Sequence, residues 1–259
     1  DWAKSLDVTI LSESEDTDID ILYYVGCSGS FDDRNKKVAT SFVKVLQAAG
    51  VRFGILGAEE KCCGDSARRM GNEYLFQQLA QENIEAMKKY GVKKIVTTCP
   101  HGYNIIKNEY PQLGGDFEVY HHTDYIARLI AEGKLKLVNP VNQSIAYHDS
   151  CYLGRYNGLY QEPRKVIQSI AGAKLVEMER NCERSFCCGA GGGRMWMEEH
   201  QGKRINHLRF EDAVNTKAPM IGTACPFCLT MLDDATKDKE MEESIKVKDV
   251  TELIEEALE

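Results

Sequence analysis

The sequence predicts an α/β fold made of two homologous Rossmann-like lobes with parallel sheets, related by a pseudo-twofold. Three observations predict it: an internal repeat, an alternation of apolar runs with helical patterns, and a composition with 43% hydrophobic and 28% charged residues. That balance is typical of a globular protein with a core. The 259 residues are enough for two domains of ordinary size.

The internal repeat is carried by cysteines. The first half contains Cys27, Cys62-Cys63-Gly64 and Cys99-Pro100-His101-Gly102, and the second contains Cys151, Cys187-Cys188-Gly189 and Cys225-Pro226-Phe227-Cys228. These motifs recur at offsets of 124 (27 to 151), 125 (62 to 187) and 126 (99 to 225). We therefore expect an N-terminal extension or linker over residues 1–18 and two homologous domains over residues 19–141 and 142–259. The boundary falls in a turn-like stretch, residues 139–142.

Strands and helices alternate along both halves. Short apolar runs predict buried strands at residues 21–25, 51–56, 94–97, 117–120, 144–147, 174–178, 219–223 and 245–247. Apolar residues at helical spacing predict helices at residues 36–49, 73–90, 123–131, 164–170, 195–214, 229–234 and 250–258. Such alternation predicts parallel sheets with helices on both faces. Cys27, Cys99, Cys151 and Cys225 follow predicted strands, where open α/β sheets form their sites.

Composition and chain ends exclude several classes of protein. The sequence contains no run of 18 apolar residues that would predict a transmembrane helix. The formal charge of −8 argues against nucleic acid as a main partner. The chain begins at Asp1 without an initiator Met or a signal peptide, so we expect a piece of a longer protein. The ten cysteines are clustered, which favours metal ligation over a secreted disulfide framework.

The second half offers five thiolates: Cys151, Cys187, Cys188, Cys225 and Cys228. Thiolates are soft ligands that suit iron–sulfur clusters, zinc and Cu(I), and four of them usually hold an iron–sulfur cluster. The glycines of residues 189–193 let the backbone approach a bound group closely. A zinc site and a metal-free thiol–disulfide site are the alternatives. A phosphate-binding loop does not fit, because Arg194 occupies the last glycine position of G-x-G-x-x-G.

The first half keeps four cysteines, Cys27, Cys62, Cys63 and Cys99, but carries Gly102 where the second half has Cys228. Four thiolates suffice for a cluster or for zinc, so we predict a second iron–sulfur cluster or a zinc ion here. His101 is a candidate to replace the missing metal ligand, a residue that hydrogen-bonds a metal ligand, or a loop residue without a role at the metal.

Other polar residues near these motifs have weaker signals. His148 precedes Cys151 and is a candidate to hydrogen-bond a cluster or a substrate, or else a core histidine; it is the candidate catalytic residue. Cys182 lacks a counterpart in the first half and is interpreted as a bystander. We expect four histidines on the surface or on helix faces: His121, His122, His200 and His207. Three arginines near the motifs are candidates to offset thiolate charge or to meet an anionic partner, or else are solvated or ion-paired side chains: Arg155, Arg194 and Arg204.

The cysteine pattern resembles the cysteine-rich CCG domain of heterodisulfide reductases and their relatives, over nearly the whole chain. The resemblance is carried by residues 148–155, by Cys187-Cys188-Gly189 with the glycines that follow, and by residues 225–234. Residues 196–200 and 225–234 are most similar to one branch, and the first half fits that branch as well through Tyr24-Val25-Gly26-Cys27 and Thr97-Thr98-Cys99-Pro100-His101. That branch comprises iron–sulfur oxidoreductases that pass electrons from electron-transfer flavoprotein to menaquinone.

The resemblance implies an iron–sulfur oxidoreductase in which the five-cysteine set holds a noncubane 4Fe–4S cluster. It implies electron-transfer flavoprotein or other redox subunits as partners, and a membrane only through segments or partners outside this chain. A cytoplasmic location, at the inner face of the membrane when part of a complex, follows from the same resemblance. Gly102 places a second noncubane cluster in question, and with it cleavage of a disulfide. The alternatives are a disulfide or heterodisulfide reductase and a zinc-bearing scaffold without redox chemistry.

Overall fold

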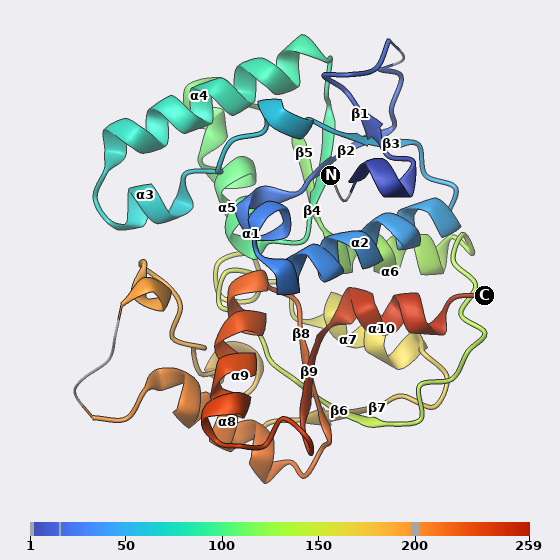
Figure 1. The fold of residues 1–259 in the computed structure, drawn as a ribbon, viewed down its shortest axis with the longest axis vertical. Helices are drawn as coiled ribbons and strands as arrows, with labels where there is room; N and C mark the ends of the chain where they lie inside the picture. The colour runs from blue at the N-terminus through green and yellow to red at the C-terminus, as the bar shows by residue number, and fades with distance from the viewer. Residues whose placement is uncertain (1–2, 16, 198–201) are drawn as a thin grey trace. The chain divides into compact units, whose positions relative to one another are not determined.

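The computed structural model describes residues 3–15, 17–197 and 202–259. The chain folds as two compact units, Asp1–Leu135 and Lys136–Glu259 (Figure 1). Each unit contains a parallel sheet with helices on its faces, so the predicted α/β fold with two lobes is confirmed.

The sheet of the first unit is built from short buried strands. Its strand order is β1-β3-β2-β4-β5, and every pair is parallel. The strands are β1 (Thr9–Ile10), β2 (Ile21–Tyr24), β3 (Phe53–Ile55), β4 (Lys94–Thr97) and β5 (Glu118–His121). All residues of β2 and β3 are buried, as expected of central strands covered on both faces.

Helices of the first unit cover both faces of this sheet. They are α1 (Gly26–Phe31), α2 (Asp33–Ala48), α3 (Asp65–Arg69), α4 (Glu73–Lys89), α5 (Pro100–Asn108) and α6 (His122–Ala131), with 3-10 turns η1 (Ala3–Leu6), η2 (Gly57–Glu59) and η3 (Tyr110–Leu113). Helix α2 begins where the Asp32 side chain accepts a hydrogen bond from the Asn35 amide, 2.8 Å away. Helices α2 and α4 lie on opposite sides of the strands (Figure 1), as right-handed crossovers in opposite directions along the sheet require.

The second unit repeats this arrangement with one strand fewer. Its order is β7-β6-β8-β9, again all parallel. The strands are β6 (Ser144–Tyr147), β7 (Lys174–Glu177), β8 (Met220–Thr223) and β9 (Lys246–Asp249). The helices are α7 (Gln161–Ser169), α8 (Ile205–Asn215), α9 (Pro226–Asp238) and α10 (Val250–Ala257), with 3-10 turns η4 (Cys182–Arg184) and η5 (Arg194–Trp196). The order β3-β2-β4-β5 of the first sheet is therefore matched strand for strand.

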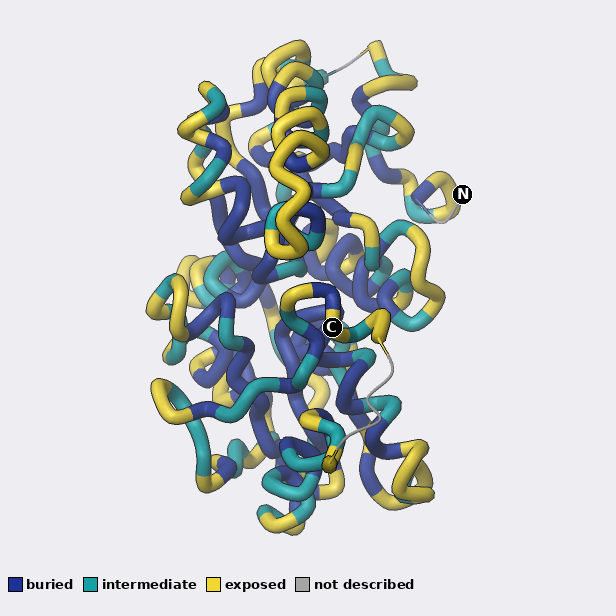
Figure 2. Tube along the Cα trace, turned by 90° about the vertical axis from the view of Figure 1, so that its left-hand side faces the viewer, coloured by how far each residue is buried: buried dark blue, intermediate teal, exposed yellow. Residues whose placement is uncertain are grey.

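Each unit has its own core around its sheet. Figure 2 shows the strands buried and the outer faces of the helices exposed. In the first unit, Tyr23 of β2 packs edge-on against Phe42 of α2, with ring centroids 5.0 Å apart. In the second unit, Ile145, Ile221 and Ile254 are fully buried. Among the described helices, none combines the length and the apolar character that crossing a bilayer requires.

The helices that start at the cysteines differ from the sequence prediction. Helix α1 was not predicted, because a six-residue helix that begins at Gly26 has no periodic apolar pattern. Helix α5 was missed as well, although Pro100 stands at its first position, where proline is favoured. The long helix predicted over residues 195–214 is wrong: η5 ends at Trp196, and α8 begins at Ile205. Residues 198–201 of that prediction lie outside the described residues.

Candidate metal centres

The five cysteines of the second unit arrive from three loops at the carboxyl edge of the sheet. Cys151 follows β6, and Cys187 and Cys188 lie in the long loop after β7. Cys225 is the N-cap residue of α9, two residues after the end of β8, and Cys228 lies in the first turn of that helix. Because parallel strands end at the same edge, residues far apart in sequence meet there.

The five thiols form a continuous series of hydrogen-bonding contacts. Cys151 and Cys188 both donate to Cys187. Cys228 donates to the Cys188 sulfur, with the two Sγ atoms 3.3 Å apart, and it also contacts Cys225. All five cysteines are free thiols. The structure thus brings together the whole predicted set of the second half.

Cys187 lies at the centre of this series and is favoured as a thiolate. Hydrogen bonds from Cys151 and Cys188, and one from the Gly189 amide 3.2 Å away, lower the pKa of Cys187 to about 2. The pKa of Cys151 is raised by the hydrogen bond that Cys151 donates to Cys187 and by burial. Deprotonation of one thiol is therefore stabilised by its neighbours, which prepares the set for a cation.

Three of the five second-unit cysteines are buried, and Cys151 and Cys187 are half-buried. Cys188, Cys225 and Cys228 are buried in an apolar cluster with Phe227 and Met231. A cavity of about 300 Å³ borders Cys187 and is lined by methionines, glycines and two arginines: Gly189, Gly191, Arg194, Met195, Met197 and Arg204. Burial keeps solvent from most of the thiols, and the cavity leaves one side of Cys187 accessible.

Two buried charged networks hold the loops around these cysteines. The Asp149 carboxylate accepts hydrogen bonds from both terminal nitrogens of Arg164, at 2.7 and 2.8 Å, and from the Cys182 amide at 2.8 Å. His148, at the end of β6, accepts a hydrogen bond at Nδ1 from Nε of Arg209, 2.9 Å away. Burial and the Arg209 charge hold the pKa of His148 well below its usual range.

The four cysteines of the first unit occupy the equivalent loops. Cys27 lies in α1 after β2, Cys62 and Cys63 lie in the loop after β3, and Cys99 is the N-cap residue of α5. Cys27 and Cys63 donate to Cys62 and, with the Gly64 amide, lower the pKa of Cys62 to about 3. The hydrogen bond to Cys62 and burial raise the pKa values of Cys27 and Cys63, and the charge on Cys99 adds to this effect. The same member of each Cys-Cys pair is therefore the favoured thiolate.

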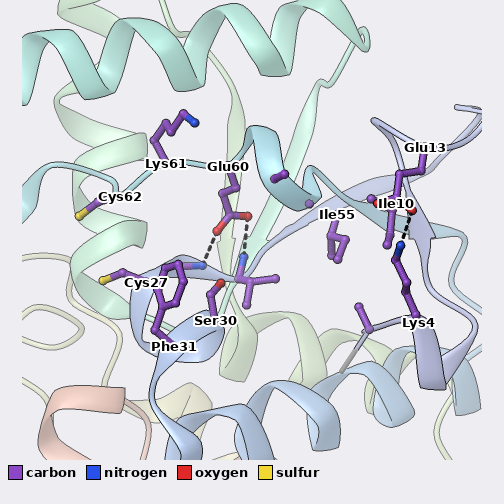
Figure 3. Close-up of a pocket in the computed structure, with 15 residues that line it drawn as sticks. Lys4, Ile10, Glu13, Cys27, Ser30, Phe31, Ile55, Glu60, Lys61 and Cys62 are labelled. Atoms are coloured by element: carbon purple, nitrogen blue, oxygen red, sulfur yellow. Dashed lines mark hydrogen bonds and ion pairs between the residues drawn. The ribbon is translucent and has the colours of Figure 1, made fainter. Parts of the chain in front are cut away.

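The first-unit set is more open than the second. Cys27 is exposed, and of the four only Cys63 is buried. A cavity of about 440 Å³ is bordered by Cys27, Cys62, Glu60 and Phe31 (Figure 3). Glu60 accepts the amides of Val25 and Gly26, at 3.1 and 2.7 Å, and burial raises the pKa of Glu60 to about 7.

Gly102 lies in the first turn of α5, where α9 has Cys228. A Cβ atom at Gly102 would be 3.6 Å from Thr97 Oγ1 and 3.8 Å from Cys99 Cβ, which are ordinary contact distances. The structure therefore has room for a Cβ atom at this position. His101 is buried, and its Nδ1 lies 2.7 Å from the Asp65 carboxylate, so Asp65 fixes the orientation of this ring.

Sequence reasoning missed several residues near both sets. Glu60, Asp65 and Arg209 were not singled out, because a lone charged residue does not reveal in the sequence that the fold will bury it, as with Asp65 and Arg209, or half-bury it, as with Glu60. Arg209 is the largest of the fully buried side chains among the described residues. A signal was present at Glu60 and Asp65, which stand two residues before and after the Cys-Cys pair.

The histidine predictions need a correction. His121 and His122 were expected on the surface or on a helix face, but both are fully buried. His121 is the last residue of β5 and packs against Tyr103 with ring centroids 6.0 Å apart, and His122 is the first residue of α6 and packs against Phe42 at 5.9 Å. His207 is partly exposed and pairs with Asp238, and His200 lies outside the described residues.

Among the arginines near the motifs, Arg155 and Arg204 bind to other residues of this chain. Arg155 donates to the Ser185 carbonyl, and Arg204 forms an ion pair with Asp238 at 2.7 Å. Arg194 is exposed at the rim of the second-unit cavity. Cys182 is half-buried in η4, and its interpretation as a bystander stays a prediction.

Both units match one family of known proteins. Residues 21–107 and 145–233 match the cysteine-rich domain called CCG. An EtfAB:quinone oxidoreductase of Syntrophomonas wolfei is 52% identical over 259 residues, covering 97% of this chain and 36% of that protein. The probable iron-sulfur-binding oxidoreductase FadF of Bacillus subtilis is 51% identical over 256 residues, covering 98% and 36%.

A more distant relative has a different named activity. It is one of the subunits of the dihydromethanophenazine:CoB–CoM heterodisulfide reductase of Methanosarcina barkeri, and it is 39% identical over 245 residues, covering 92% of this chain and 59% of that protein. The chain thus spans 36% to 59% of the length of these three relatives.

Proposed function

This chain belongs to the cysteine-rich CCG-domain family, and on that premise we propose that it is an iron–sulfur oxidoreductase module. Its relatives are named as iron–sulfur-binding and quinone oxidoreductases and as a component of a heterodisulfide reductase. In this proposal the second unit holds a noncubane 4Fe–4S cluster on five cysteines: Cys151, Cys187, Cys188, Cys225 and Cys228. When bound, the cluster would supply one-electron transfer.

The observation that carries the proposal is the unbroken series of five thiols. A tetrahedral zinc ion takes four ligands, so it leaves one of these five sulfurs unused. A set of five adjacent thiolates instead suits a group with several metal atoms. The Gly189 amide already donates to the Cys187 sulfur, and such amide donors stabilise negative charge on thiolates and cluster sulfur. The residues present therefore fit the cluster.

The surrounding residues would exclude water and orient the ligands. The apolar cluster of Phe227 and Met231 covers Cys188, Cys225 and Cys228. The Asp149–Arg164 pair holds the loop that begins with Cys151 and, through the Cys182 amide, the loop that leads to Cys187. Low solvent exposure and fixed dipoles are two means by which proteins set cluster potentials.

In the first unit, we propose that Cys27, Cys62, Cys63 and Cys99 hold a second metal group, either an iron–sulfur cluster or zinc. Their thiols are in the same arrangement as the first four of the second unit, and the Gly102 position supplies no thiolate. The adjoining cavity gives this site an accessible side. A disulfide reductase is the alternative function, supported by the relative named as part of a heterodisulfide reductase.

Metal analysis of the anaerobically purified full-length protein tests the proposal. We expect about four iron and four sulfide per chain from the second unit, with further iron or one zinc from the first, and visible absorbance that bleaches on reduction. Zinc alone, without absorbance, would contradict the redox function and favour a scaffold.

Mixing with partners then tests the electron path. We propose that electrons arrive from electron-transfer flavoprotein and leave to a quinone, at the cytoplasmic face of a membrane. Reduced flavoprotein should bleach the visible absorbance on mixing, and added quinone should restore it. A new paramagnetic state formed on adding a thiol to the oxidised protein would instead favour disulfide reduction.

A further inference from the structure

His148 is a buried polar residue beside the second-unit cysteines, and the proposed ligand set does not use it. Its side chain is 1% exposed. One of its ring nitrogens lies within 4.8 Å of the sulfur atoms of both Cys188 and Cys228. Nδ1 is occupied by the Arg209 donor, and Nε2 is buried without a hydrogen-bond partner among the described residues. A buried ring nitrogen of this kind requires a partner that a bound group would provide.

Arg209 determines which nitrogen of His148 carries the proton. A guanidinium is permanently charged and only donates, so its Nε–H must meet a lone pair on Nδ1. The imidazole proton then resides on Nε2. Arg209 itself is fully buried and is fixed by Asp212 Oδ2, 2.9 Å from Nη1, and by the Arg180 carbonyl, 2.8 Å from the same nitrogen. The tautomer is therefore set by a rigid ion pair.

This arrangement excludes His148 as a metal ligand. To bind a metal through Nε2, the ring would have to carry its proton on Nδ1, where the N–H would face the Arg209 N–H. Two opposed donors in a buried site are strongly unfavourable. Nε2–H can only donate, and thiolate or sulfide sulfur is the acceptor at hand.

We propose that His148 is a positioning residue that donates a hydrogen bond from Nε2 to sulfur of the second-unit cluster, in a tautomer enforced by Arg209. The inference rests on the proposed function, since it needs the cluster as acceptor. A donor aimed at sulfur stabilises the more negative, reduced state more than the oxidised one. The His148–Arg209 pair would thereby raise the reduction potential of the second-unit cluster.

The first unit lacks this donor at the equivalent position. Tyr24 stands there, at the same offset of 124 that relates Cys27 to Cys151. Its Cε1 is 3.8 Å from a Cβ built on Gly102, just as His148 lies beside Cys228. The Tyr24 hydroxyl donates to the Lys61 carbonyl, 2.6 Å away. The two units thus present different groups to their cysteines, and Tyr24 provides a matched control.

The experiment compares H148F, H148Q and Y24F in the full-length protein. Iron and sulfide content is measured first, and then the midpoint potential of the second-unit cluster. In H148F we expect the full iron and sulfide content but a lower midpoint potential. At a fixed solution potential, the ratio of reduced to oxidised cluster should fall about tenfold, which corresponds to a shift of about 59 mV for one electron. H148Q, whose amide both accepts from Arg209 and donates, should recover most of the shift, and Y24F should leave the potential unchanged.

Three outcomes overturn the inference. Equal potentials in H148F and the parent would remove the donor role, and loss of iron from both His148 variants would make His148 a ligand. If H148F does not fold, ¹⁵N-histidine-labelled parent protein decides: an exchangeable N–H proton coupled to the paramagnetic cluster is expected, and its absence contradicts the inference. A parent protein without iron and sulfide would refute the proposed function itself, which is a separate result.

Discussion

The two units have the same strand order and the same loops for their cysteines, but they surround those cysteines differently. In the second unit, Cys188, Cys225 and Cys228 are buried in an apolar cluster. In the first, Cys27 is exposed beside a cavity of about 440 Å³, and Gly102 replaces the fifth cysteine. Topology therefore fixes where the cysteines arrive, whereas single residues decide how many there are and how far water reaches them.

The largest effect should come from breaking the second set at its centre. Cys188→Ser removes a buried thiol that contacts both Cys187 and Cys228, so we expect loss of the second-unit cluster and of its visible absorbance. The measurement is iron and sulfide content with the absorption spectrum.

Cys63→Ser is the matched control, because Cys63 holds the same position in the first unit. It should leave the second-unit signal intact and alter only the first metal group. An unchanged spectrum in Cys188→Ser would refute the ligand assignment.

The next variant tests whether Gly102 alone accounts for the difference in metal binding between the cysteine sets of the two units. In Gly102→Cys, the new Cβ would meet neighbours at 3.6 to 3.8 Å, so the first turn of α5 accepts a Cβ at this position. We expect this variant to bind more iron and sulfide than the parent after reconstitution, by up to about four of each.

Gly102→Ala distinguishes the effect of the added thiol from the effect of replacing a glycine in the helix. Alanine stabilises a helical position by about 0.5–1 kcal/mol relative to glycine, but it adds no ligand. If both variants bind the same iron, then the exposed surroundings of Cys27 rather than the missing thiol limit the first site.

Strands and the positions of the cysteines can be predicted from the sequence, whereas the short helices at the cysteine motifs cannot. The strands β4 and β6 were predicted to the residue, because buried parallel strands are short apolar runs. The cysteine repeat also predicted which residues would meet, and their role as ligands stays a prediction. Helices α1 and α5 were not predicted, since their starts at Gly26 and Pro100 lie within the motifs themselves.

Burial of polar residues was the part that sequence could not provide. His121 and His122 were expected on the surface or on a helix face, because neither composition nor spacing shows that the end of β5 and the start of α6 face the core. Both are fully buried. The contact between Arg209 and His148 joins residues 61 positions apart, and no local pattern encodes it. Both depend on which helix covers which face of the sheet.

A smaller effect is expected on the free energy of unfolding, from the ion pair that holds the loops around the second-unit cysteines. Asp149 and Arg164 form a doubly hydrogen-bonded pair with both side chains almost fully buried. Asp149→Asn leaves a buried guanidinium whose remaining carboxylate partner is Glu177, 2.7 Å away. We expect a loss of about 3 kcal/mol in the free energy of unfolding, the lower end for a broken buried pair, measured by urea denaturation.

An exposed pair in the first unit is the comparison. Asp18 and Arg52 have side chains 78% and 59% exposed, so Asp18→Asn should change stability by less than about 1 kcal/mol. Equal losses in the two variants would mean that the Asp149–Arg164 pair does not anchor the second-unit loops.

The smallest effect lies where the last strand of each sheet passes into a helix. At this position the second unit has Asp249, which accepts the Thr251 amide at 2.9 Å, while Glu252 accepts the Asp249 amide at 2.8 Å. The first unit has His121 there, which makes no side-chain cap of α6. Asp249→Ala should cost about 1 kcal/mol, the usual loss for a capping residue, measured by thermal denaturation. Glu252→Gln keeps an acceptor and should be nearly neutral. A neutral Asp249→Ala would mean that packing of α10 on its neighbours, as for α6 in the first unit, is sufficient to end the sheet and start the helix.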